Sequence, residues 1–249
     1  MMSARRLLFS LLTACLLASP AGSRANGLNL SWDACGAAGV ANKQFACSDN
    51  YWFEYLVLSA EFPMEWIGSL PISFDATLDF TSAQATLPNW WRTAAGECRA
   101  GAIVSGFESD GRVGSCTASA DAAGSLRTLA WTPSGISPER RRLTISSRPE
   151  VGYDGVYASG EMLMDALQIS HVKTTGLGAC SGCGTPVCIV FNSLTVYDYP
   201  PFGGVRAYVT NPLQRNFVTW QGGTSGMAIC PAATPARNRT WGVLKTLYR

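Results

Sequence analysis

The feature that most restricts the fold of this chain is a cluster of cysteines followed at once by a strand-like run. Residues 178–197 read GACSGCGTPVCIVFNSLTVY, with Cys180, Cys183 and Cys188 close together. β-Branched and aromatic residues, which fit a pleated surface, dominate the part after the cysteines and predict a strand over residues 187–197. In any fold of the chain, this strand must therefore directly follow a loop whose cysteines can fix it by disulfide bonds.

The N-terminus has the layout of a bacterial secretory signal. Arg5 and Arg6 precede an apolar run over residues 7–17, and small residues follow. We predict a signal peptide over residues 1–25 and a mature chain that begins at Asn26, with a cut after Ala21 as the alternative. Residues 12–15 also resemble a lipobox, which gives lipidation at Cys15 as a second alternative, although the apolar run continues past this cysteine.

The cysteine count of the mature chain is even. Nine cysteines become eight once Cys15 is removed, and an even count in an exported chain predicts four disulfides. Proximity in sequence favours the pairs Cys35–Cys47 and Cys98–Cys116, with the other four cysteines pairing among themselves. The predicted disulfide cysteines are Cys35, Cys47, Cys98, Cys116, Cys180, Cys183, Cys188 and Cys230.

The charge of the mature chain is close to zero. Of 19 basic residues the signal removes Arg5, Arg6 and Arg24, which leaves 16 against 17 acidic residues and a net charge of −1. This balance does not indicate a nucleic-acid partner, which calls for a basic surface. No later stretch approaches 18 uninterrupted apolar residues, so we expect no transmembrane span in the mature chain.

Short strand patterns separated by turn residues recur along the chain. The clearest is residues 72–80, ISFDATLDF, where apolar and polar residues alternate as in a half-buried strand. Residues 51–62 are so rich in aromatic and aliphatic residues that we expect both faces of that strand to be buried. The basic run Arg140–Arg142 is typical of a solvated edge strand. Further strands are expected at residues 28–32, 101–107, 126–132, 141–147, 162–173, 187–197, 206–210 and 217–220. For residues 162–173, a bent pair of strands and the start of a helix are the alternatives.

These elements predict an all-β fold, an antiparallel β-sandwich with a jelly-roll-like arrangement that is stabilised by disulfides. An open or barrel-like variant is the alternative. We expect one sandwich domain over residues 26–231.

Catalytic and metal chemistry are not favoured by the sequence. The CxxC of Cys180 and Cys183 is followed by a β-rich run instead of the helix that activates redox thiols, so we interpret it as a structural bridge, with redox exchange and a zinc site as minor alternatives. The only histidine, His171, lies in a strand-like segment without a nucleophile motif, and we expect it to be partly buried. We predict no catalytic residue, no metal site and no cofactor.

Eight tryptophans make aromatic ligand binding worth considering, because sugar rings stack on exposed aromatic faces. Most of them are expected to be core residues. Trp90 and Trp91 are the predicted exceptions and the tentative ligand-binding residues, since two adjacent bulky rings at a turn are hard to bury together.

The composition changes after Cys230. Residues 232–249 are expected to form a linker and a basic amphipathic tail with a short helix, whose shared apolar face would serve sorting or docking. The residues of that face are Trp241, Leu244, Leu247 and Tyr248.

In LPNWW (87–91), GACSGCGTPVCIVFN (178–192) and TWGVLKTLYR (240–249), the chain resembles a family of secreted, disulfide-containing β-rich bacterial proteins to which no activity is assigned. The ending also resembles short C-terminal extensions of exported bacterial proteins. The resemblance implies a secreted or cell-surface location and transfers no catalytic residue. We predict a non-catalytic binding or structural module whose partner is a glycan or a component of the cell envelope. A glycoside hydrolase-like or other carbohydrate-active domain is the alternative.

Overall fold

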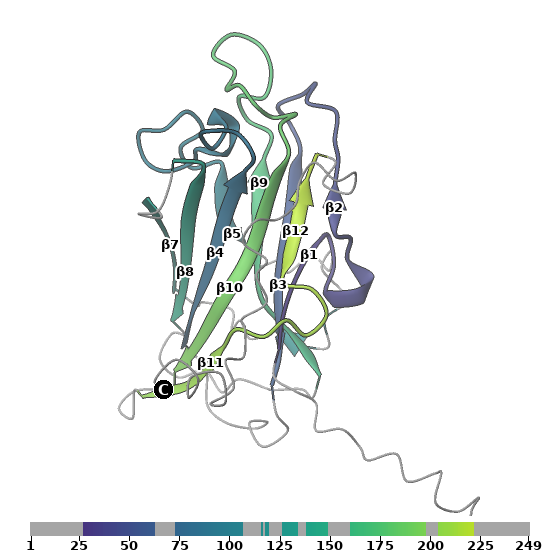
Figure 1. The fold of residues 1–249 in the computed structure, drawn as a ribbon, viewed down its shortest axis with the longest axis vertical. Coiled ribbons are helices and arrows are strands. Elements are labelled where there is room, and N and C mark those ends of the chain that lie inside the picture. The colour runs from purple at the N-terminus through teal and green to yellow at the C-terminus, as the bar shows by residue number, and fades with distance from the viewer. Residues whose placement is uncertain are drawn as a thin grey trace, which may run out of the picture.

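Two β-sheets pack face to face in this protein (Figure 1). The computed structural model describes residues 27–62, 73–106, 116, 118–119, 126–133, 138–148, 160–197 and 204–221. Nearly all pairings between their strands are antiparallel, and the parallel ones are the short contacts of β2 with β12 and of β6 with β9. The predicted antiparallel β-sandwich is therefore confirmed.

The first sheet, sheet A, has the strand order β1-β3-β9-β5, and the short β6 also pairs with β9. The second sheet, sheet B, has the order β2-β12-β10-β4-β8-β7, and β11 also pairs with β10. The strands of sheet A are β1 (Gly27–Trp32), β3 (Phe53–Glu61), β5 (Ile103–Gly106), β6 (Ala118–Ser119) and β9 (Glu161–Ser170). Those of sheet B are β2 (Asn42–Lys43), β4 (Ser73–Ser82), β7 (Leu126–Pro133), β8 (Arg140–Arg148), β10 (Val187–Tyr197), β11 (Val205–Val209) and β12 (Phe217–Trp220).

Strand β4 shows how the alternating pattern builds the core. Phe74, Ala76, Leu78 and Phe80 are fully buried between the sheets, as the sequence predicts. The register places Leu78 between Leu143 of β8 and Phe191 of β10, so each inward residue packs against apolar neighbours on both sides. Strand β10 has the predicted bounds and lies at the centre of sheet B.

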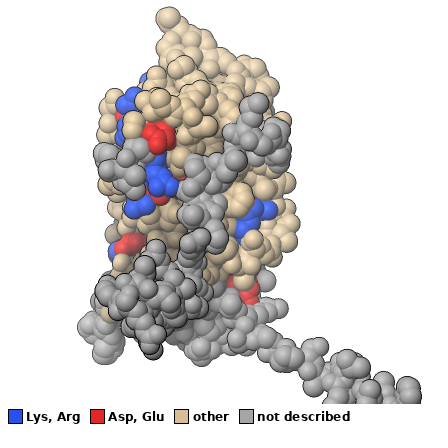
Figure 2. All heavy atoms as spheres, viewed as in Figure 1, with Lys and Arg blue, Asp and Glu red and all other residues tan. Residues whose placement is uncertain are grey.

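Two expectations about particular strands are wrong. Strand β8 is not an edge, because β7 pairs with it along its length. Its arginines are held by acids instead: Arg142 donates two hydrogen bonds to Asp79, at 2.8 and 2.9 Å, and Arg141 contacts Glu97. In Figure 2, charges of both signs lie mixed on this side of the molecule. The start of residues 51–62 is exposed, whereas the sequence predicts burial on both faces.

A second, smaller apolar cluster is separate from the main core, which lies between the two sheets. It joins the Cys35–Cys116 disulfide to Val57 of β3 and to Leu163 and Ala166 of β9. The disulfide therefore fixes the short 3-10 helix η1 (Gly36–Ala38) and its loop near sheet A.

Several sequence predictions fall outside the described residues. These are the signal peptide, the alternative lipidation at Cys15, Cys230, the domain boundary at residue 231 and the tail with its predicted helix. Within the described part of the chain, no helix is long and apolar enough to cross a membrane.

Candidate functional site

Three loops meet at one end of the sandwich, the upper end in Figure 1, and we call this region the loop end. It consists of residues 44–52 before β3, residues 83–102 between β4 and β5, and residues 171–186 between β9 and β10. The middle loop contains the 3-10 helix η3 (Asn89–Trp91).

The CxxC motif joins all three loops. Cys180 is bonded to Cys98 in the second loop, and Cys183 is bonded to Cys47 in the first. Both motif cysteines are buried. The interpretation of the motif as a structural bridge is confirmed, and the alternatives of a redox thiol pair and a zinc site are wrong for these two residues.

The disulfide pairing inferred from proximity is wrong. Cys35 pairs with Cys116, with 5.3 Å between their Cα atoms, and neither Cys47 nor Cys98 bonds to its neighbour in sequence. An antiparallel sandwich brings loops of the same end together whatever their separation along the chain, and the bridged pairs are 81 to 136 residues apart. Cys188 is disulfide-bonded as well.

The residues between the two cysteines fit closely against η3. Gly182 has a φ of +95°, and a Cβ added to it would lie 2.5 Å from the Cβ of Pro88. The backbone N–H of Trp90 donates to the carbonyl of Ser181, at 2.9 Å. The motifs LPNWW and CSGC, which are distant in sequence, are therefore two halves of one contact.

Trp90 and Trp91 are both fully buried, so the expectation that they are exposed is wrong. The ring of Trp90 stacks on Trp220, with 5.0 Å between ring centroids, and its Nε1 donates to Thr174. Trp91 packs edge-to-face on Trp220 at 5.2 Å. Two adjacent rings can be buried at this turn because the third loop closes over them. A ligand has no access to either ring in this structure.

Arg99 also anchors the loop end from inside. Its guanidinium lies 3.5 Å from the centroid of the Trp90 ring and donates to the carbonyls of Trp90, Ser170 and Val172. Burial lowers the pKa of Arg99 to about 9, so the side chain still carries its charge at neutral pH. One buried cation thus ties the second loop to the third.

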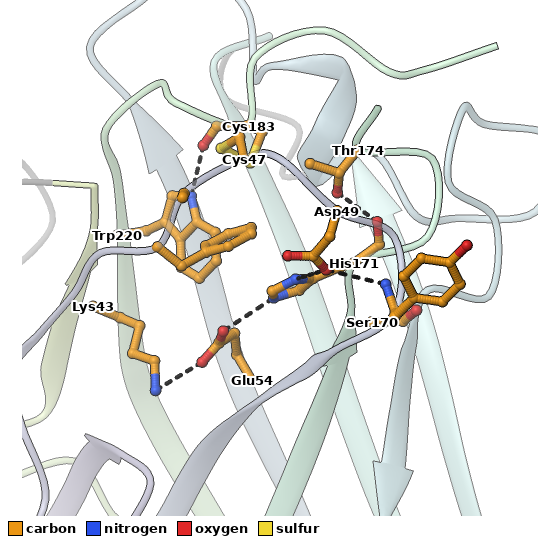
Figure 3. Close-up of polar contacts among 12 residues, drawn as sticks. Lys43, Cys47, Asp49, Glu54, Ser170, His171, Thr174, Cys183 and Trp220 are labelled. Carbon is orange, nitrogen blue, oxygen red and sulfur yellow. Dashed lines mark hydrogen bonds and ion pairs between the residues drawn. A yellow bond between two sulfur atoms is a disulfide. The ribbon is translucent and has the colours of Figure 1, made fainter. Parts of the chain in front are cut away.

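His171 is the centre of a polar network that includes Asp49, Glu54 and Lys43 (Figure 3). Its Nε2 lies 3.0 Å from Glu54 and its Nδ1 lies 3.2 Å from Asp49. Glu54 in turn contacts the ammonium of Lys43 at 2.7 Å, and Lys43 reaches Asp33. A neutral imidazole donates from one nitrogen only, so this arrangement needs either an imidazolium or one protonated carboxyl group.

The charges of the network support one another. Burial disfavours the charge of Lys43, but hydrogen bonds to Asp33 and Glu54 outweigh it and raise the pKa of its ammonium above the ordinary value. The backbone N–H of Tyr51 is the main cause that lowers the pKa of Asp49. These contacts therefore favour the ammonium form of Lys43 and the carboxylate form of Asp49.

The network is poorly placed for acid–base chemistry. His171 is buried, as the sequence predicts in part, and Phe45 stacks on its ring with 3.9 Å between centroids. Both ring nitrogens already face carboxylates, so neither is available to a substrate. No group of three or more histidine, cysteine or acidic side chains suited to a metal ion occurs among the described residues.

The exposed feature of the loop end is a run of three aromatic residues, which we call the aromatic ridge: Tyr51, Trp52 and Phe53. Their exposed fractions are 85%, 68% and 50%. Val172 and Leu177 in the facing loop are exposed as well. Sequence reasoning missed the ridge, although the turn residues Asp49 and Asn50 directly before it were a usable signal that the strand begins only at Phe53.

The backbone of the ridge is fixed on both sides. The N–H of Tyr51 donates to Asp49, at 3.1 Å, and the carbonyl of Trp52 accepts from the N–H of His171, at 2.8 Å. Asn50 accepts from the N–H groups of Thr174 and Thr175, at 2.8 and 3.0 Å. The rings are therefore presented from an ordered frame.

Comparison with known proteins adds little to this description. No protein-family model matches the sequence, and no match is found among curated proteins. Among solved structures, the chain is similar to a cohesin module from a family 33 glycoside hydrolase of Clostridium perfringens, with 10% identity and a TM-score of 0.30. The alignment covers 78% of this chain and 92% of that module. A TM-score this low supports no argument, so the assignment as a β-sandwich rests on the strand pairing described above.

Proposed function

We propose that the protein is an exported, non-catalytic binding module that contacts its partner through the aromatic ridge. The observation that carries the proposal is the exposure of Tyr51, Trp52 and Phe53 on a backbone held by hydrogen bonds at both ends. Tyrosine and tryptophan are enriched at binding surfaces because they supply a large contact area with few rotatable bonds.

Rigidity of the loop end also supports binding. Association is weakened when loops must be ordered on contact, and an ordered frame lowers that cost. Here the disulfides of Cys180 and Cys183 and the buried Arg99 fix the loops before a partner arrives. The buried position of His171 and its contacts with two carboxylates support the non-catalytic part of the proposal.

Export is supported by the cross-links, since disulfides form and persist in oxidising compartments. Mass spectrometry of the protein from fractionated cells tests this part. We expect a chain that begins at Asn26 in the extracellular or envelope fraction. A full-length chain in the cytoplasm would contradict export.

The binding surface is tested by retention of the purified protein on cell envelopes of the producing bacterium. Tyr51→Ala and Trp52→Ala should each lower retention, and the double variant should abolish it. Tyr208→Ala is the matched control, because Tyr208 on β11 is 66% exposed but lies on sheet B, away from the ridge. Equal retention of the double variant and the wild type would sink the proposal.

A further inference from the structure

The partner class can be inferred from the chemistry around the aromatic ridge, and this inference rests on the proposed function. We infer that the ridge binds an uncharged glycan, with sugar rings stacked on Tyr51 and Trp52 and hydroxyl groups donating to Asp49.

The first step concerns the shape of the surface. Two adjacent side chains, Tyr51 and Trp52, expose most of their rings, while the aromatic residues of η3 are buried beneath. Stable protein interfaces need about 800 Å² on each partner and a broad apolar centre. A run of three residues with a few exposed apolar neighbours is narrow by comparison. Its flat rings suit the apolar face of a sugar ring better than a protein surface.

The second step concerns charge. Asp49 lies two residues before the ridge and is partly exposed, and the hydrogen bond from the backbone N–H of Tyr51 lowers its pKa, so it stands beside the ridge as a carboxylate. Glu54 and Asp33 both contact the ammonium of Lys43, so their charges are compensated. Lys173 in the facing loop is a single exposed cation, and its ammonium donates to a backbone carbonyl at 2.9 Å. An acidic polysaccharide or an anionic membrane would meet this carboxylate without a cluster of cations to attract it.

The third step concerns the hydroxyl groups of the ligand. The Asp49 side chain is 31% exposed, and a carboxylate has about four acceptor sites. Tyr51, Trp52 and His171 donate to this carboxylate and fix its position without exhausting its acceptor capacity. A neutral sugar supplies hydroxyl groups that can donate to the Asp49 carboxylate. It also has an apolar ring face that can stack on the rings of the aromatic ridge. The geometry thus favours an uncharged glycan over a charged polymer.

The experiment measures binding of the disulfide-intact mature chain to a panel of defined probes. The uncharged probes are cellulose, amylose, a soluble β-1,3-glucan and chitin. The charged probes are alginate and heparin, and the membrane probes are vesicles of phosphatidylcholine with and without phosphatidylglycerol. We expect binding to at least one uncharged polysaccharide and none to the charged or membrane probes.

Variants connect the binding to the ridge. Tyr51→Ala and Trp52→Ala should each weaken binding of the uncharged polysaccharide about tenfold, since loss of a stacking ring removes on the order of 1.4 kcal/mol. Trp52→Phe should keep most of the affinity because it retains a flat ring. Tyr208→Ala should bind like the wild type, and thermal unfolding should show that all four variants are folded.

The outcomes separate this inference from the proposed function. Binding to alginate, heparin or vesicles in place of the uncharged probes would overturn the glycan inference. So would envelope retention that depends on the ridge without binding to any uncharged polysaccharide, and in both cases the proposed function would stand. Binding that Tyr51→Ala and Trp52→Ala leave unchanged would overturn both.

Discussion

The loop end and the outer face of sheet B both carry paired charges, but they are built by different means. On sheet B, Asp79 and Arg142 are direct neighbours in the register of β4 and β8, so the sheet itself brings them together. In the loop end, His171 contacts Glu54 and Asp49, which lie 117 and 122 residues away in sequence. Ladder hydrogen bonds position the first pair, whereas cross-links and buried side chains position the second group.

This difference shows where a binding surface can vary independently of the fold. The outer face of sheet B cannot change its geometry without changing the strands. The loop end is held by contacts between residues far apart in sequence, and its aromatic ridge depends on the disulfides of Cys180 and Cys183 more directly than the sheet residues do. Loops held on a rigid scaffold are the usual site of binding function.

The largest expected effect comes from removing one cross-link of the loop end. The double variant Cys98→Ser/Cys180→Ser should lower the free energy of unfolding by about 2–5 kcal/mol. Hydrogen exchange should become faster in residues 171–186, while β4 and β8 keep their protection. Cys35→Ser/Cys116→Ser is the control, since it should loosen residues 33–40 and leave the loop end protected. Faster exchange throughout sheet B in the first variant would contradict the distinction between the two regions.

A smaller effect is expected from the contact between the two sequence motifs. Gly182→Ala places a side chain at positive φ and against Pro88, and should destabilise the protein by about 2 kcal/mol. Gly184→Ala is the matched control, because a Cβ there meets no atom within 4 Å. Urea unfolding measures both. Equal stability of the two variants would show that the third loop does not need its close approach to η3.

The smallest effect is a difference in pH dependence between the two regions. Lys43 is the last residue of β2 and contacts Glu54 of the His171 network; its pKa is raised, so its contribution is present below pH 10.5 and is lost as the pH rises through the raised value. For Asp75 on sheet B, partial burial opposes ionisation, but hydrogen bonds outweigh it and lower the pKa. Its contribution is therefore present above pH 3.8 and is lost as the pH falls through the lowered value.

Variants of these two residues test that difference. Lys43→Met should flatten the fall in stability at alkaline pH, and Asp75→Asn should flatten the fall at acidic pH. Each change should be below about 1 kcal/mol, because both side chains remain in contact with water. Thermal unfolding across the pH range measures both. A change on the same side of the pH range for both variants would contradict the assignment.

Much of the sandwich could be predicted from local sequence. Strand β4 follows from its alternation, and β10 and β12 have the predicted bounds, because side-chain period and strand propensity are properties of short segments. The location of the signal peptide and the tail stays a prediction. The position of β8 inside the sheet could not be read from its arginines, since a basic run is equally compatible with an exposed edge and with acids on a neighbouring strand.

The candidate site was much less predictable. The sequence predicted that Trp90 and Trp91 are exposed and that residues 51–62 are buried. In the structure Trp90 and Trp91 are buried, and the aromatic ridge at the start of residues 51–62 is exposed. Burial of a ring depends on which loop covers it. Residues 171–186 cover Trp90 from 84 residues away, as its hydrogen bond to Thr174 shows, whereas Trp52 is 68% exposed and no loop among the described residues covers it.

By itself, the sequence determined the β-rich class, most strand positions and the structural role of the CxxC motif. Only the tertiary structure decided which cysteines pair, which aromatic residues reach solvent and how His171 is held. The physical reason is the range of the interactions. Strand periodicity is set by neighbours along the chain, while disulfides, ring burial and the charge network join loops that meet only when both sheets have closed around one core.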